Sequence, residues 1–273
     1  MASVTYIERR YNHDIYTVCL AENYITVTVT ASASVVKRWL SSTLYFNRYF
    51  VDQERLVVGL GVQWTRGGHD PPPDTLQLCV GRRCLIFQLA HADYVPESLR
   101  TFLNDPSHTF VGFWNHSDRL KLACSEHELE MAMDPLDLRL CFESLTRDSV
   151  ETIVAKCLGY RVPQRRDISV SAWYVEYLSN DQVAYATVDA FCAFLIGSVA
   201  YCSICQACMP CFEFRRLNQW LFWFFIDDDL IVYLLFPSLA CACFLCECRT
   251  DKSAFTFVYG LSSCVHYCQT VFE

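Results

Sequence analysis

The chain has 273 residues and a formal net charge of −8, which is enough length for one full core with an appendage or for two small domains. The negative charge argues against a strong sequence-independent grip on nucleic acid, which depends on many Lys and Arg contacts to phosphates. It leaves room for a local basic groove, for which Arg82-Arg83 and Arg165-Arg166 are candidates, although such pairs more often lie in solvated turns. Charged residues within 7–14 interrupt any apolar run near the N-terminus, so no signal peptide is expected.

The 17 cysteines are unevenly distributed along the chain. Six lie singly in apolar surroundings before residue 190, as is typical of small core residues in a reducing compartment, the nucleus or the cytoplasm. The other eleven fall between Cys192 and Cys268. This shift predicts two parts, a folded domain of residues 22–198 and a cysteine-rich and aromatic-rich extension of residues 199–273.

Hydrophobic periodicity and turn residues predict an alternation of strands and helices. In chain order these are a strand at 22–30, a helix from Ser32 or Ser34 to about Leu44, strands at 56–63, 75–80 and 84–89, a short helix at 96–103, a short strand at 109–113, and helices at 118–124, 148–158 and 181–197. Residues 56–63 form an apolar run that is typical of a buried central strand, and the hairpin after it predicts an antiparallel meander. An α/β fold follows, with a mixed sheet and helices on both faces.

Six short stretches occur in an order and at a spacing that are specific when taken together. They are residues 57–64, 76–81, 110–112 followed by Asp118, 158–159, 171–173 and 182–190. In these stretches the chain resembles the DnaQ-like 3′–5′ exonucleases of the DEDDy type, and most closely the plant branch related to the exonuclease domain of the Werner syndrome protein. The resemblance covers residues 22–197. It implies an RNase H-like α/β fold with a mixed five-stranded sheet, action on the 3′ ends of nucleic acid, and Mg²⁺ or Mn²⁺ as cofactor.

The resemblance also implies a site in which four carboxylates hold two divalent metal ions, and the ions clamp the attacking and leaving oxygens of the phosphate. Asp118 matches the aspartate of the second motif, and Tyr185 with Asp189 matches the last motif. The spacing of four residues puts Tyr185 and Asp189 on one helical face. By resemblance, Asp118 and Asp189 bind metal and Tyr185 orients the attacking water.

The first motif departs from the pattern of the family. Gly61 stands where the family has an aspartate, and Gln63 stands where it has a glutamate. Three nearby acids do not obviously substitute for the missing pair: Glu54, Asp70 and Asp74. Asp137 is another candidate member of the cleft, but one acid there does not restore the pair. We therefore expect a degenerate site with impaired or absent catalysis.

Other interpretations remain open from the residues alone. Asp118 is also what a helix N-terminus favours through its dipole, and Tyr185 and Asp189 also suit an ordinary polar helix face. Two functions follow from the resemblance and its departure. One is an impaired 3′–5′ exonuclease, and the other is a non-catalytic module that uses the old cleft to bind a single-stranded nucleic-acid end or a protein partner.

The extension carries two cysteine clusters, Cys202, Cys205, Cys208 and Cys211, and Cys241, Cys243, Cys246 and Cys248. Such clusters can hold zinc or an iron–sulfur centre, but four ligands at an uninterrupted spacing of three are cramped for one tetrahedral ion. Residues 230–246 form an uncharged run of 17 residues, which is shorter than the ~20 needed to span a membrane. Neither a metal site nor a membrane anchor is expected here, and the extension is predicted to lack an organised function.

Overall fold

The computed structural model describes residues 2–67, 70–141, 145–205, 221–226 and 229–234. Its contacts divide the chain into two units, Met1–Asn218 and Gln219–Glu273. Each unit is described by itself. The first unit contains all the stretches that carry the resemblance.

The first unit is built on an eight-stranded mixed sheet with the strand order β1-β2-β3-β6-β5-β4-β7-β8. The strands are β1 (Ser3–Arg10), β2 (His13–Leu20), β3 (Asn23–Thr30), β4 (Val57–Gln63), β5 (Thr75–Val80), β6 (Arg83–Gln88), β7 (Thr109–Gly112) and β8 (Leu136–Asp137). The expected meander is confirmed, because β4, β5 and β6 pair antiparallel. On either side of it, β3 pairs with β6 and β7 pairs with β4 in parallel, which makes the sheet mixed.

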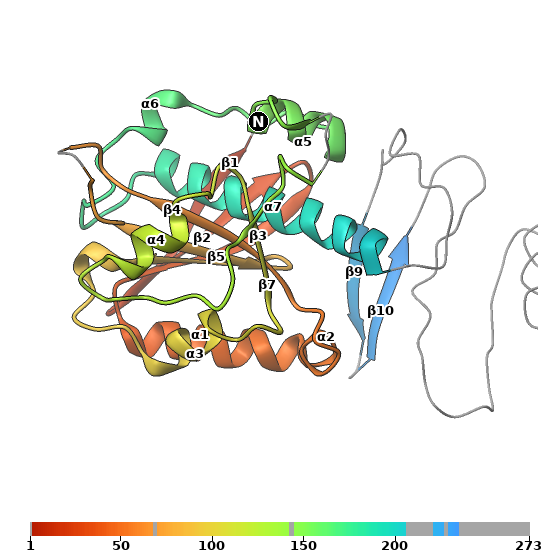
Figure 1. The fold of residues 1–273 in the computed structure, drawn as a ribbon, viewed down its shortest axis with the longest axis horizontal. Helices are drawn as coiled ribbons and strands as arrows, with labels where there is room; N and C mark the ends of the chain where they lie inside the picture. Colours follow the sequence, from red (N-terminus) through yellow and green to blue (C-terminus); the bar gives the residue numbers. More distant parts are fainter. Residues whose placement is uncertain (1, 68–69, 142–144, 206–220, 227–228, 235–273) are drawn as a thin grey trace, which may run out of the picture. The chain divides into compact units, whose positions relative to one another are not determined.

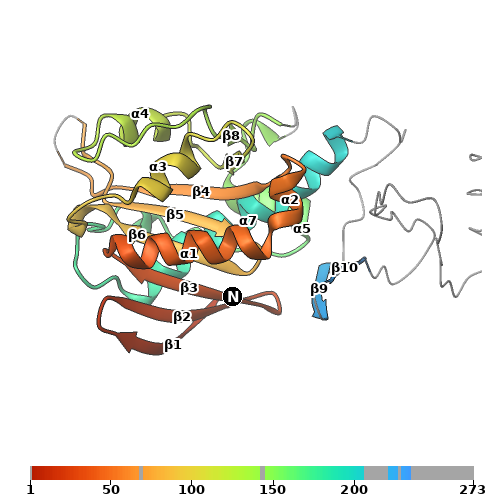
Figure 2. The ribbon, with the colours of Figure 1, turned by 90° about the horizontal axis from the view of Figure 1, so that it is seen from below.

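Helices cover both faces of this sheet (Figure 1 and Figure 2). They are α1 (Ala33–Phe46), α2 (Arg48–Asp52), the 3-10 turn η1 (Leu89–His91), α3 (Glu97–Leu103), α4 (Asp118–Ala123), α5 (Val150–Leu158), α6 (Arg166–Ser169) and α7 (Asn180–Cys205). Helices α1, α2 and α3 lie on one side, and α5, α6 and α7 lie on the other. The central strand β5 is buried along its whole length between these layers. The α/β prediction with helices on both faces is therefore confirmed.

The predicted number of five strands is wrong, because β1 and β2 precede residue 22 and β8 follows β7. Seven of the eight residues of β1 are exposed, so the strand has no apolar alternation that would reveal it in the sequence. The hairpin of β1 and β2 extends the sheet at the edge beyond β3 (Figure 2). Strand β8 has only two residues. The sheet thus begins at Ser3, before the expected start of the domain at residue 22.

The last helix does not end near Gly197 as expected but continues to Cys205. A Cβ added at Gly197 would lie 2.6 Å from Cγ2 of Val111, so the glycine allows α7 to pack closely against β7. Gly197 is therefore a packing residue and not a helix terminator. Within the described residues, one helical stretch, 180–200, is long and apolar enough to cross a membrane, but about 67% of it is buried inside the domain, as is usual for a core helix.

Of the second unit, the structure describes an antiparallel strand pair, β9 (Leu221–Ile226) and β10 (Asp229–Leu234). The start of the uncharged run at 230–246 is thus a strand. The remainder of that run and most of the two cysteine clusters lie outside the described residues. The interpretation of residues 199–273 as an extension without organised function stays a prediction.

Candidate functional site

The site begins with the contact between the central strand β4 and helix α7. A Cβ added at Gly59 would lie 1.9 Å from the carbonyl oxygen of Ala190, so only a glycine allows this approach. Alternate residues of a strand share a face, so Gly61 and Gln63 lie on the face of β4 that α7 covers. Asp189 immediately precedes Ala190 on the helix. The structure thus brings the first-motif positions and the last-motif aspartate to the same side of the sheet.

The space beside Gly61 is filled by a buried glutamine. Gln77 lies opposite Gly61 in the register of β4 and β5 and is fully buried. Its Nε2 donates to Oγ1 of Thr75 at 2.6 Å, whereas its Oε1 has no hydrogen-bond partner. A Cβ added at Gly61 would lie 2.8 Å from that Oε1. An aspartate at this position would therefore require the flexible end of Gln77 to move.

Asp118 is the first residue of α4 and is 4% exposed. Burial raises the pKa of its carboxyl to about 7; Lys121 opposes this effect, and Asp137 and Asp189 add to it. The charges of Asp137 and Asp189 thus both act on the Asp118 carboxyl. The site therefore gathers acidic groups from α4, β8 and α7.

Tyr185 and Asp189 lie four residues apart on α7, as the spacing predicts. Both are partly buried, and burial raises the pKa of Asp189 to about 7 despite a hydrogen bond from Gln164. Nε2 of Gln164 donates to Oδ1 of Asp189 at 2.6 Å. The Tyr185 ring lies 6.1 Å from the ring of Trp173, and burial followed by the charge of Asp189 raises the pKa of its hydroxyl. Tyr185 is thus fixed beside Asp189, but its part in catalysis stays a prediction.

Asp137 is held by an arginine of its own segment. The side chain of Arg139 donates from Nε at 3.0 Å and from Nη2 at 2.5 Å to the Asp137 carboxylate, and both residues are buried. The guanidinium lies 3.4 Å from the ring centroid of Trp114. Trp114 has a φ of 53°, which is a strained backbone conformation for a large side chain. The Asp137 carboxylate is therefore neutralised inside the protein.

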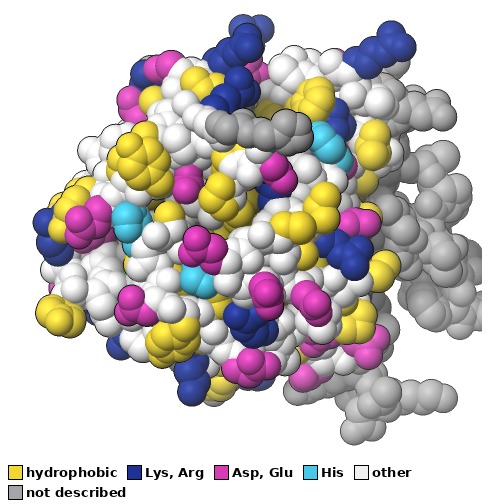
Figure 3. Space-filling view, turned by 60° about the vertical axis from the view of Figure 1, so that its left-hand side comes forward, with side chains coloured by type: hydrophobic (Ala, Val, Ile, Leu, Met, Phe, Trp, Pro, Cys, Tyr) yellow, Lys and Arg dark blue, Asp and Glu magenta, His cyan; other side chains and the backbone are white. Residues whose placement is uncertain are grey.

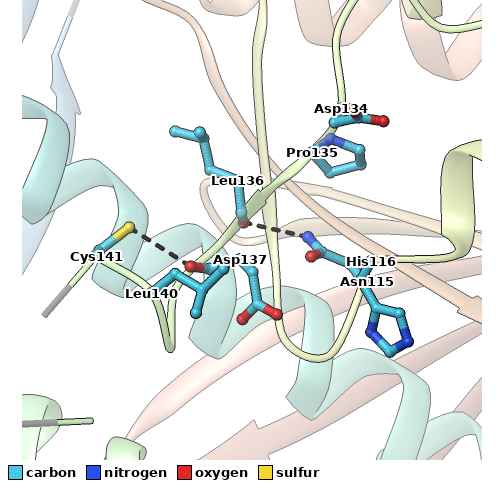
Figure 4. A pocket seen from close by; sticks show the side chains of 8 residues that line it. All are labelled: Asn115, His116, Asp134, Pro135, Leu136, Asp137, Leu140 and Cys141. Atoms are coloured by element: carbon cyan, nitrogen blue, oxygen red, sulfur yellow. Dashed lines mark hydrogen bonds between the residues drawn. The ribbon is translucent and has the colours of Figure 1, made fainter. Parts of the chain in front are cut away.

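A cavity of about 440 Å³ lies beside β8 (Figure 4). Its lining residues are Asn115, His116, Asp134, Pro135, Leu136, Asp137, Leu140 and Cys141. Nδ2 of Asn115 donates to the carbonyl oxygen of Leu136 at 3.1 Å, which ties the loop after β7 to β8. Asp137 lines this cavity and also helps to raise the pKa of Asp118.

Replacing Arg139 by Met is expected to lower the free energy of unfolding by about 3–5 kcal/mol, because removing one partner of a buried pair leaves an uncompensated charge. Urea denaturation at pH 7 measures the change. The matched control is Arg119→Met, whose ion pair with Asp134 at 3.4 Å is exposed and should contribute less than about 1 kcal/mol. Equal effects of the two substitutions would contradict the importance of the buried pair.

The acids and basic pairs that the sequence singled out are mostly engaged elsewhere. Asp74 accepts from the backbone N and Oγ1 of Thr65, both at 2.6 Å, and Asp70 accepts from Lys121 at 2.7 Å. Arg165 binds two carboxylates, those of Asp167 and Asp181. Burial lowers the pKa of Arg83, which donates to Ser42. None of these acids replaces the missing first-motif pair.

The residues of this candidate site do not fit a centre for two metal ions. Within the part of the chain that the structure describes, no three Asp, Glu, His or Cys side chains lie close enough to hold one ion. Gly61 and Gln63 bring no carboxylate, Asp137 is satisfied by Arg139, and Asp189 is bound by Gln164. A hard ion such as Mg²⁺ needs oxygen ligands of this kind to be held. The expected cofactor is therefore not supported by the donor set.

Sequence reasoning missed three residues of the site, Gln77, Arg139 and Gln164. Arg139 lies only two residues after Asp137, in the turn that follows β8, so its proximity to Asp137 in the sequence is the only signal for the pair. Gln77 is recognisable as the partner of Gly61 only once the register of β4 and β5 is known. Gln164 has no such signal, since it lies in a loop 25 residues from Asp189.

The sheet order and the helix packed across β4 define an α/β domain of the RNase H-like class. The fold is that of the exonuclease domain of Nibbler from Aedes aegypti, with a TM-score of 0.52 at 16% identity over 69% of this chain and 92% of that one. RNase D of Escherichia coli also matches with a TM-score of 0.52, at 15% identity over 66% of this chain and 46% of that one. No protein-family model matches the chain.

Curated proteins with the name of 3′–5′ exonuclease are similar to this chain in sequence. The exonuclease 3′–5′ domain-containing protein 2 of Drosophila melanogaster is 30% identical over 159 residues, which is 56% of this chain and 26% of that protein. A 3′–5′ exonuclease of Drosophila grimshawi is 25% identical over 65% of this chain and 54% of its own length. The chain thus spans about a quarter to a half of these relatives. It has the fold of the 3′–5′ exonuclease domains and is similar in sequence to proteins that carry them.

Proposed function

We propose that the first unit is a 3′–5′ exonuclease-like domain that binds the 3′ end of single-stranded nucleic acid and hydrolyses it poorly or not at all. One observation carries the loss of hydrolysis, namely the absence of both first-motif carboxylates from β4 at Gly61 and Gln63. The similarity to curated 3′–5′ exonucleases supports a nucleic-acid end as the ligand. We further propose the plant branch related to the Werner exonuclease domain and a reducing compartment, the nucleus or the cytoplasm.

Phosphodiester hydrolysis by this class depends on charge stabilisation at the reacting phosphate, and without it the barrier rises by several kcal/mol. Every ~1.4 kcal/mol lowers the rate tenfold. The remaining acids, Asp118 and Asp189, have pKa values near 7, so at neutral pH each carries its proton part of the time and binds cations poorly. The proposed domain therefore keeps the fold of an exonuclease domain but lacks the carboxylates that hydrolysis needs.

Binding is expected to depend on the end of the strand more than on its charge. The face in Figure 3 carries basic and acidic side chains intermixed, not gathered into one basic stripe. The net charge of −8 argues against a long electrostatic contact with phosphates, and the face in Figure 3 shows no basic stripe that would provide one. The proposed ligand is therefore a short 3′ segment and not an extended duplex or strand.

Fluorescence anisotropy and a gel assay on the full chain test both parts of this proposal. A linear single-stranded oligonucleotide should bind at least tenfold more tightly than a circular one of the same sequence. The 5′-labelled linear strand should not shorten with Mg²⁺ or Mn²⁺. Shortening that disappears in Asp189→Ala would contradict the loss of activity. Equal binding of the linear and circular strands would contradict end binding, and no binding of either would favour a module that binds a protein.

A further inference from the structure

Gln164 is fixed at the cleft from two sides. Its Nε2 donates to Oδ1 of Asp189 on α7 at 2.6 Å, and its backbone N donates to Oε1 of Glu151 in the first turn of α5 at 2.7 Å. The loop that carries Gln164 is therefore tied to both helices. These two hydrogen bonds fix the position of the Gln164 carboxamide beside Asp189.

A carboxylate that loses water on burial needs a hydrogen-bond donor or a cation in compensation. The described part of the cleft supplies such partners from the chain itself. Arg139 satisfies Asp137 with two nitrogen atoms, and Gln164 satisfies one oxygen of Asp189. The N–H of Gln164 occupies one lone pair of Oδ1, which leaves fewer open lone pairs on Asp189 for a metal ion.

We propose that Gln164 is a positioning residue that takes the place of a cation at Asp189, so that the cleft keeps its shape without a metal ion. This inference rests on the proposed function, because it explains how the domain stays folded around acids that an active relative would use as ligands. It also makes a specific demand on the side chain. The side chain at position 164 must donate a hydrogen bond to Asp189. A side chain of the same shape that cannot donate should leave the two facing carboxylates unstable unless a cation binds between them.

The isosteric substitution Gln164→Glu tests this demand in the full chain. It exchanges the donor for a second carboxylate beside Asp189, with Asp118 in electrostatic range. The wild-type Tm is expected to be the same in EDTA and in Mn²⁺. The Tm of Gln164→Glu should be lower in EDTA and should rise with Mn²⁺, by about 4 °C at ten times the dissociation constant for a protein of this size. Calorimetry should give Mn²⁺ binding at least tenfold tighter than in the wild type.

The matched control is Gln88→Glu. Gln88 is a buried glutamine whose Nε2 donates to the carbonyl oxygens of Val175 and Glu176, at 3.1 and 2.9 Å. Its substitution should lower the Tm as well, but Mn²⁺ should not restore it, because the partners are backbone carbonyls and not a carboxylate. Gln88→Glu thus shows how far the Tm falls when a buried amide is lost without a new cation site being created.

Two outcomes would overturn the inference: a wild-type Tm that rises with Mn²⁺ as much as that of Gln164→Glu, or a Gln164→Glu Tm that does not fall in EDTA. If Gln164→Glu fails to fold with and without Mn²⁺, Gln164→Ala decides, since its Tm must gain an Mn²⁺ response that the wild type lacks. The readout contains no nucleic acid. A failure here is therefore distinct from a failure of end binding or an unexpected nuclease activity, which the oligonucleotide assays report.

Discussion

The double substitution Gly61→Asp with Gln63→Glu is expected to create metal-dependent 3′–5′ hydrolysis in a chain that otherwise shows little or none. The two changes supply the carboxylates that β4 lacks, on the face that α7 covers next to Asp189. With Asp118, they complete a set of four acids. Metal ions held by the four acids would stabilise the transition state by several kcal/mol, so the gain in rate should reach several orders of magnitude. Either change alone should achieve much less.

The substitution at Gly61 is sterically feasible. The nearest atom to the new Cβ is Oε1 of Gln77, at 2.8 Å, which is the far end of a flexible side chain. Gly61 does not have a positive φ, so an aspartate meets no backbone strain there. Thermal denaturation and circular dichroism should therefore show a folded double variant.

The hydrogen bond from Gln164 competes with metal for Asp189, so adding Gln164→Ala should tighten Mn²⁺ binding further. Calorimetry and a 3′-end digestion assay measure binding and rate separately. Robust digestion by the native chain that Asp189→Ala abolishes would show that Gly61 and Gln63 do not limit activity. A double variant that binds two ions yet cannot cut would show that the cleft differs from that of active relatives beyond its ligands.

The second large effect is on the dependence of stability on pH. Burial raises the pKa of Asp118 from 3.8 to about 7, so the folded state holds a proton that the unfolded chain releases. The stability that this proton contributes is fully present below pH ~4 and is lost as pH rises through 7. A pKa difference of one corresponds to about 1.4 kcal/mol, so the loss is up to about 4 kcal/mol for Asp118. Burial likewise raises the pKa of Asp189 to about 7, so Asp189 adds an effect of the same sign.

Asp118→Asn is therefore expected to stabilise the chain at pH 8 by about 2 kcal/mol or more and to leave its stability at pH 4 nearly unchanged. Urea denaturation in EDTA from pH 4 to 8 measures both ends of the profile. The control is Asp105→Asn, because hydrogen bonds from Ser107 lower the pKa of Asp105 and its loss should destabilise the chain above pH 4. If the free energy of unfolding of the wild type and of Asp118→Asn depended on pH in the same way, the raised pKa of the Asp118 carboxyl would be contradicted.

The central part of the fold follows from local patterns in the sequence. The apolar run at 56–63 and the hairpin around Gly81 predict three neighbouring strands, and the structure pairs them in that order. Hydrophobic alternation is a strong signal here because these strands are buried by layers on both sides. Strand β1 is exposed at seven of its eight residues, so no burial pattern reveals it, whereas β2 buries alternate residues near its end.

Glycine shows the same division between local and tertiary causes. Gly159 ends α5 with a φ of 77°, a local backbone requirement that the sequence alone predicts. Gly197 has a similar position late in an apolar helix, yet α7 continues past it, because the demand there is close packing against Val111. Only the approach of helix and strand distinguishes the two glycines.

The candidate site divides along the same line. From its resemblance to a family, the sequence predicts that Asp118, Tyr185 and Asp189 occupy the positions of a 3′–5′ exonuclease site and that Gly61 and Gln63 leave it without two carboxylates. The partners of the remaining acids become visible only in the folded chain. It places the carboxamide of Gln164 on Asp189 and the guanidinium of Arg139 on Asp137. A buried carboxylate is stabilised by the donor that the folded backbone places beside it. For Asp189 this donor is Gln164, which lies 25 residues away in the sequence, so no local pattern predicts the contact.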